Sequence, residues 1–212
     1  MAAGETAAQH DDRSGHDDVL RALRTRTAEE HRTVEDLLDL LDPQLDRQRL
    51  AQVLTVMHGF WVAAERGLDE WAARRPVDAS TVAWERRRRA GLFATDLRAL
   101  GVPASADVPL LAAVADTDQA LGRLYVLEGS TLGGAFIDRH LALLPGLADV
   151  RIRAFSPYGA DTGAMWAAYR RVTREHVRAG GDADRVVAAA RETFRALAQW
   201  CRPVARGREV PV

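Results

Sequence analysis

The chain has 212 residues, of which 47% are hydrophobic and 28% are charged. This is the size and composition of one globular domain with a substantial core, so a wholly disordered chain is excluded. Its 29 basic residues are all arginines, and with 30 acidic residues they leave a net charge of -1. That balance excludes the basic field of a general nucleic-acid or anionic-membrane binder. Cys201 is the only cysteine, which excludes an intrachain disulfide, a cysteine zinc site and an iron–sulfur cluster.

The pattern of residues divides the chain into three parts. Residues 1–17 are polar and aperiodic and predict a mobile N-terminal tail, residues 18–200 predict a helical domain, and residues 201–212 predict a C-terminal tail. The N-terminus has no apolar signal segment, and no stretch approaches the roughly 18 apolar residues of a membrane span. We therefore expect a soluble, cytoplasmic protein.

Within the domain, apolar residues recur at helical spacing between Pro- and Gly-containing stops. The arginine run 86–89 is interpreted as a solvated helix face. No segment alternates at period two, so the prediction is an all-α, single compact domain of roughly six helices. The predicted helices cover residues 19–41, 46–75, 80–100, 109–144, 164–178 and 182–200.

His31 lies on the apolar stripe of the first predicted helix, where an imidazole is an awkward core residue. A buried neutral histidine is a natural metal ligand. Glu35, one helical turn later, can accept a hydrogen bond from the second ring nitrogen and fix the tautomer. A histidine at the edge of the core with an ordinary surface partner gives the same pattern, so both interpretations stay open.

The segment 124–134, LYVLEGSTLGG, is rich in glycine inside a predicted helix. Gly129 and Gly133 are four residues apart and share a helix face. Bare backbone there admits a flat group at close range, or alternatively lets a second helix pack tightly. The adjacent Ser130 and Gly134 are less well explained by helix packing.

Other chemistries lack their motifs. The chain has no HExxH, no helical ExxH, no nucleophile elbow, no Walker A loop and no GxGxxG. His58, His140 and His176 have no partners at ligand spacing, and they are interpreted as packing or surface residues.

Two of these segments resemble motifs of the bacterial heme oxygenases, including members found beside bacterial phytochromes. Residues 27–35 resemble the proximal helix of that family, and residues 124–134 resemble its distal helix. Weaker similarity at 96–101 and near the C-terminus extends the resemblance over about residues 20–200. Mammalian members have an Asp where Ser130 stands here, which leaves the proton path open.

The resemblance implies a heme oxygenase fold that holds heme b between the proximal and distal helices. Heme would be both prosthetic group and substrate. With O2 and external electrons, it would be cleaved at a meso carbon to biliverdin, with release of CO and ferrous iron.

The same resemblance implies roles for individual residues. His31 would be the axial ligand of the heme iron, and Glu35 would support it. The catalytic residues on the distal side would be Gly129, Ser130 and Gly133. Further heme contacts would be Gly134 and Tyr125. Arg24 and Arg170 would bind the heme propionates, or alternatively would be solvated surface residues. Arg171 and Arg174 could take the place of Arg170.

The chain has no flavin or nicotinamide motif, so electrons would come from a ferredoxin or a ferredoxin reductase-type donor docked on the arginine-rich surface. A bacterial phytochrome could accept the biliverdin, and no nucleic-acid or membrane partner is expected. Two rival hypotheses stay open. One is a non-catalytic heme-binding carrier or sensor, and the other is a helical scaffold in which His31 packs and the glycines bring two helices together.

Overall fold

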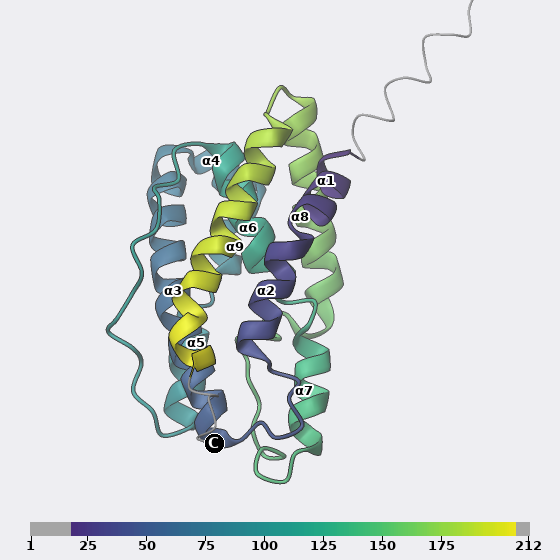
Figure 1. Ribbon diagram of the computed structural model, residues 1–212. Helices are drawn as coiled ribbons and strands as arrows, with labels where there is room; N and C mark the ends of the chain where they lie inside the picture. Colours follow the sequence, from purple (N-terminus) through teal and green to yellow (C-terminus); the bar gives the residue numbers. More distant parts are fainter. Residues whose placement is uncertain (1–17, 207–212) are drawn as a thin grey trace, which may run out of the picture.

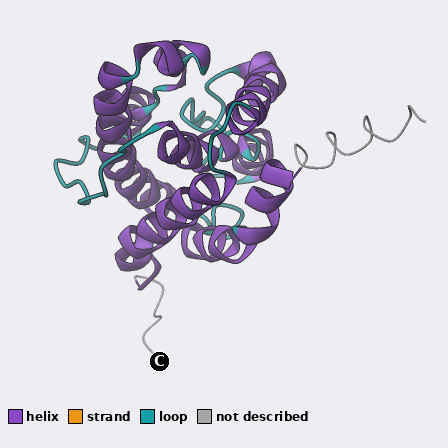
Figure 2. Ribbon diagram, turned by 90° about the horizontal axis from the view of Figure 1, so that it is seen from above, coloured by secondary structure: helices purple, strands orange, loops and turns teal. Residues whose placement is uncertain are grey.

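The computed structural model describes residues 18–206, which form helices joined by loops and turns, with no strand in that range (Figures 1 and 2). The all-α prediction is confirmed. The predicted N-terminal tail, 1–17, and residues 207–212 lie outside the described part. The helices are α1 (Asp18–Arg26), α2 (Ala28–Leu38), α3 (Arg47–Arg74), α4 (Pro76–Thr81), α5 (Ala90–Ala99), α6 (Thr117–Gly129), α7 (Gly134–Leu143), α8 (Thr162–Arg178) and α9 (Ala183–Arg206), with short 3-10 helices at Trp84–Arg87 and Gly159–Asp161.

The long C-terminal helix α9 organises the fold, because it packs against α6, α2, α1 and α3. Its contact with α6 is close at Gly122, where an added Cβ would lie 2.3 Å from the Val186 carbonyl oxygen and 2.9 Å from the Ala190 nitrogen. Small residues on both helices therefore let the two backbones approach. A core of aromatic side chains from α3, α5 and the loop before α8 fills the space behind them, with Trp61 against Phe93 and Phe93 against Phe155.

The first predicted helix, 19–41, is two helices that meet at Thr27. The Thr27 side chain is buried, and its hydroxyl donates to the carbonyl of Leu23 at 2.7 Å, a contact that bends helices. The helix then ends at Leu38, three residues earlier than predicted, because Asp39 adopts a left-handed conformation with φ 43°. The second predicted helix, 46–75, is confirmed as α3 within one residue at each end.

The third predicted helix, 80–100, is wrong as a single helix. The chain breaks at Ala83, where φ is 54°, and again at Arg88, which is extended. The interpretation of residues 86–89 as a solvated face is wrong for Arg87 and Arg89, which are 2% and 1% exposed. Outside a regular α-helix these side chains alternate, so Arg86 and Arg88 face water and the other two face the core.

The remaining segments differ from the prediction mainly at their ends. Residues 109–116 are a loop, so the helix predicted from 109 begins at Thr117, and it breaks over residues 130–133. α8 starts two residues before the predicted position. The predicted C-terminal tail is wrong over 201–206, because α9 continues to Arg206 and buries Cys201 and Val204 in the core. No helix within residues 18–206 has the length and apolar character needed to cross a bilayer.

Candidate functional site

His31 and Glu35 pair on α2 as the sequence predicts. The imidazole Nδ1 lies 3.2 Å from Glu35 Oε2, and 51% of the His31 side chain is exposed. The Nε2 atom has no hydrogen-bond partner among the described residues. A neutral ring that directs its Nδ1 proton to Glu35 leaves the Nε2 lone pair free to bind a metal centre.

Aromatic rings connect His31 to the distal helix α6. Phe194 of α9 meets the imidazole edge-on, with centroids 5.5 Å apart and planes at 81°, and its centroid lies 6.5 Å from that of Tyr125 on α6. Burial raises the pKa of Tyr125, while a hydrogen bond with Thr27 and the charge of Arg24 lower it in part. The predicted residues His31, Tyr125 and Arg24 therefore gather around one aromatic cluster.

Gly129 is the last residue of α6, and Gly133 directly precedes α7. Gly129 follows Tyr125 by four residues, so the two share a face of α6. A Cβ added to Gly129 would meet nothing within 4 Å, and one added to Gly133 would meet only the Ser130 carbonyl oxygen at 3.9 Å. Neither glycine is therefore needed for helix packing in the described structure. Both expose bare backbone to open space, as a binding surface for a flat group requires.

Gly134 does not belong to that open surface. An added Cβ would lie 2.2 Å from the Phe155 carbonyl oxygen and 2.7 Å from Ser156 Oγ. Gly134 is buried and lets the start of α7 pack on the loop before α8. Close packing on this loop is therefore sufficient to explain Gly134, and the expectation that it contacts heme stays a prediction.

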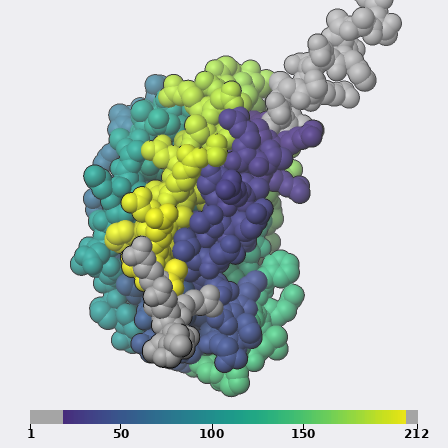
Figure 3. Space-filling view, in the orientation of Figure 1, coloured from purple at the N-terminus to yellow at the C-terminus, as the bar shows by residue number. Residues whose placement is uncertain are grey.

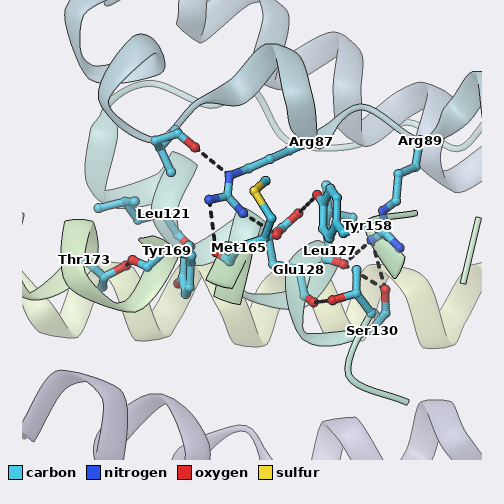
Figure 4. Close-up of polar contacts among 12 residues, drawn as sticks. Arg87, Arg89, Leu121, Leu127, Glu128, Ser130, Tyr158, Met165, Tyr169 and Thr173 are labelled. Carbon is cyan, nitrogen blue, oxygen red and sulfur yellow. Dashed lines mark hydrogen bonds and ion pairs between the residues drawn. The ribbon is translucent and has the colours of Figure 1, made fainter. Parts of the chain in front are cut away.

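The Ser130 hydroxyl forms two hydrogen bonds within the protein. It donates to the Leu127 carbonyl at 2.8 Å and accepts from an Nη of Arg89 at 3.0 Å (Figure 4). The same guanidinium binds the carbonyl oxygens of Leu127 and Ala154, and it stacks over Trp61 at 5.1 Å. Because its only proton is already donated, Ser130 holds the turn in place rather than presenting a hydrogen to the open side.

Beside it, a buried carboxylate joins three elements. Glu128 forms an ion pair with Arg87, and both side chains are 1% exposed. Its second oxygen accepts from the Tyr158 hydroxyl at 2.8 Å, and Arg87 also donates to the Met165 carbonyl at 3.3 Å (Figure 4). Burial and the neighbouring Glu128 charge raise the pKa of Tyr158, so its proton stays on the phenol. This network fixes the end of α6 to the 3-10 helix and to α8.

Sequence reasoning missed Arg87, Arg89 and Glu128. The sequence does contain a signal for one of them, because Glu128 is a single carboxylate in the apolar run LYVLEG, and a buried carboxylate demands a cationic or hydrogen-bonding partner. The identity of the partner could not be derived, since Arg87 lies 41 residues away. Glu65 is a further member, which accepts the backbone N–H groups of Arg89 and Ala90 at 2.6 and 2.9 Å.

Of Arg170, Arg171 and Arg174 on α8, Arg170 has no ion-pair partner among the described residues. It is half-buried and follows Trp166 by one turn, and the Trp166 ring lies 5.9 Å from that of Tyr125. Arg171 pairs with Glu175 at 3.6 Å, and Arg174 is also engaged. Among the described residues, neither Arg170 nor Arg24 has an ion-pair partner.

The other described histidines lie apart from this site. His140 Nε2 contacts the Asp42 carbonyl at 2.9 Å, and His176 pairs with Asp118 at 2.6 Å. His58 is buried in α3, where desolvation lowers the pKa of its ring.

Comparisons with known proteins show which family the chain belongs to. A family profile described as "Heme oxygenase" matches residues 17–203. A protein of Xanthomonas campestris pv. campestris (strain 8004) named "Heme oxygenase" is 33% identical over 152 residues, covering 71% of this chain and 87% of that protein. A heme oxygenase of Neisseria meningitidis, solved with NO and CO bound, has a similar fold, with a TM-score of 0.70 at 21% identity, covering 89% of this chain and 92% of the other. The chain belongs to the heme oxygenase family.

Proposed function

We propose that the chain cleaves heme to biliverdin, CO and ferrous iron, using O2 and electrons from an external donor. The observation that carries this proposal is that His31 on α2 and Tyr125 on α6 both contact Phe194, while Gly129, one turn after Tyr125 on the same face of α6, leaves its backbone uncovered. Membership of the heme oxygenase family supports an oxidoreductase that acts on heme.

The residues present fit heme b. His31 Nε2 offers a neutral nitrogen ligand, Gly129 and Gly133 leave room for a flat ring against the backbone, and Arg24 and Arg170 supply unpaired cations for two propionates. The rings of Phe194 and Tyr125 give this space an apolar wall.

Bound heme would supply the iron that activates O2 and the porphyrin that is oxidised. The protein's own part is to bind and orient. Glu35, whose Oε2 lies 3.2 Å from His31 Nδ1, accepts a hydrogen bond from that nitrogen, which fixes the tautomer and the orientation of the ring. Arg89 and Ser130 order the backbone of the turn after Gly129, so the glycine surface keeps its shape. Protons for the reaction would pass through water, because the Ser130 hydroxyl hydrogen is bound to Leu127.

A single-turnover assay tests the proposal. One equivalent of hemin is added to the protein, followed by a reductant in the presence of catalase, while the visible spectrum is recorded. We expect the Soret band to fall as a bilin absorption rises. A stable reduced or oxygenated heme spectrum would contradict turnover, and the absence of any Soret shift with hemin would contradict heme binding itself.

The variant His31→Ala tests the ligand. We expect it to lose the spectrum of a histidine-ligated heme and to recover it in part when free imidazole is added. The matched control is His140→Ala, whose ring contacts the Asp42 carbonyl oxygen, and its hemin spectrum should equal that of the unchanged protein. Undiminished hemin affinity in His31→Ala would favour the scaffold hypothesis.

A non-catalytic heme carrier or sensor is the second candidate. It is favoured by the commitment of the Ser130 hydroxyl, since the residue that follows the first distal glycine has no proton to offer in this structure. Such a protein would bind one equivalent of hemin and leave it intact in the assay above.

We also propose an acidic electron donor of the ferredoxin or ferredoxin reductase type, and biliverdin delivery to an acceptor such as a bacterial phytochrome. The exposed Arg32 of α2, the residue after His31, supports docking of an acidic surface close to His31. Turnover with such a donor should slow as ionic strength rises.

A further inference from the structure

Glu30, the residue before His31, points into the interface between α2 and α9. Only 10% of its side chain is exposed, although its neighbours Glu29 and His31 face solvent. Successive helical residues diverge by about 100°, so the interface that takes the Glu30 carboxylate also fixes the direction of His31.

Two arginines of α9 bind one oxygen of this carboxylate. Arg191 Nε lies 2.7 Å and an Nη of Arg195 lies 2.9 Å from Glu30 Oε1. The two arginines are four residues apart and share a face of α9 with Phe194, whose ring contacts the His31 imidazole. One face of α9 therefore contacts two consecutive residues of α2, Glu30 and His31. Figure 3 shows the two helices side by side on this side of the molecule.

The contact between His31 and Glu35 cannot set the rotation of α2, because both residues belong to that helix. Only contacts with another helix can do so. The Glu30 carboxylate is shielded, and its Oε2 has no partner.

We propose that Glu30, Arg191 and Arg195 form a clamp that sets the rotation of α2 and so holds the His31 ring against Phe194. Glu30 is then a positioning residue for the proximal ligand. Its role at a heme iron rests on the proposed function, but the clamp involves only side chains of this chain and can be tested without heme.

The experiment compares Glu30→Ala with Glu29→Ala, a matched control that removes an exposed carboxylate from the adjacent position of the same helix turn. The first readout is the NMR cross-relaxation between His31 and Phe194 ring protons in the heme-free protein, with the His31 signals assigned by their loss in His31→Ala. We expect this signal in the unchanged protein and in Glu29→Ala, and its loss in Glu30→Ala. Glu30→Gln, which keeps an acceptor without the charge, should restore part of it.

The second readout is the iron–histidine stretching band of the ferrous heme complex by resonance Raman spectroscopy. We expect a shifted or broadened band and several-fold faster heme release in Glu30→Ala, but not in Glu29→Ala. Should Glu30→Ala fail to fold, Arg195→Gln removes the more exposed partner and should weaken the ring contact in the same direction.

The outcomes separate the two proposals. An unchanged His31–Phe194 signal in Glu30→Ala overturns the clamp. Loss of that signal in a protein that never shows histidine-ligated heme supports the clamp and contradicts the proposed function.

Discussion

The two sides of the candidate site are held by different kinds of interaction. On the distal side, Glu128 and Arg87 lie in the core with 1% of each side chain exposed. On the proximal side, the arginines that bind Glu30 are 36% and 61% exposed. Breaking a buried ion pair strands a charge away from water, whereas a partly exposed pair is replaced by hydration. Removing the buried ion pair beside Gly129 should therefore destabilise the whole fold. The contacts of Glu30, which position α2 and His31, can be removed without unfolding the protein.

The variant Glu128→Ala gives the largest expected effect. It leaves the Arg87 guanidinium buried without its carboxylate, and it removes the acceptor of Tyr158. We expect a loss of about 3–5 kcal/mol in the free energy of unfolding, measured with urea. The control Glu85→Ala removes a carboxylate that is 75% exposed and pairs with Arg88 at the surface, and it should cost at most about 0.5 kcal/mol. A loss below about 1 kcal/mol for Glu128→Ala would mean that Arg87 finds another partner, and the comparison between the two sides would fail.

The distal glycines divide into two kinds, and alanine substitutions separate them. Gly134→Ala places a Cβ within 2.2 Å of a backbone oxygen, so we expect a loss of about 1–3 kcal/mol in the free energy of unfolding from overpacking. Gly129→Ala meets nothing within 4 Å, and the heme-free protein should be unchanged or up to about 1 kcal/mol more stable. The same variant should weaken hemin binding, because the new methyl group occupies the open surface. Equal destabilisation by both substitutions would contradict the assignment of an open face at Gly129.

The proximal part of the site was predictable because it is local. The His31–Glu35 pair depends only on helical spacing, which the apolar pattern around Val34 and Leu38 reveals. The all-α architecture follows from the same pattern, as does α3. The bend at Thr27 was missed, because a threonine in a helix bonds either to the preceding turn or to solvent, and the sequence alone does not decide which.

The distal network was not predictable, because its partners are far apart in the chain. A run of four arginines in a charged segment predicts exposure, and the burial of Arg87 and Arg89 depends on a break at Ala83 and on acceptors supplied by Glu128 and Ala154. Likewise, glycine spacing shows where the backbone is bare but not what approaches it. Gly134 meets the loop at Phe155, whereas Gly129 meets nothing, and only the tertiary fold distinguishes them.

The variant Ser130→Ala tests the residue that connects the buried network around Arg89 to the exposed backbone at Gly129. The substitution removes one acceptor from Arg89, which keeps the carbonyl oxygens of Leu127 and Ala154. We expect a loss of about 1 kcal/mol in the free energy of unfolding. Single-turnover heme degradation should proceed at a nearly unchanged rate, because the hydroxyl proton is not available to the open side. A tenfold slower turnover at unchanged stability would instead assign Ser130 to the proton path.

The smallest expected effect is a pH-dependent one on the proximal side. The folded protein lowers the pKa of Glu30 below its ordinary value of 4.5. Its contribution to the free energy of unfolding is therefore complete above that value, and it is lost as the pH falls through the lower value of the folded state. We expect unchanged protein and Glu30→Ala to differ by at most about 1 kcal/mol at pH 7, because both arginines are partly hydrated.

That difference should shrink as urea unfolding is repeated in steps toward pH 3, and also at pH 7 in 1 M salt, where exposed charges are screened within about 3 Å. The difference caused by Glu128→Ala should persist in salt, because its ion pair is closed to solvent. If both differences respond to salt alike, the two sides are not held by different kinds of interaction. If only the Glu30 difference responds, solution conditions weaken the contact that positions α2 and His31, while the ion pair beside Gly129 stays intact.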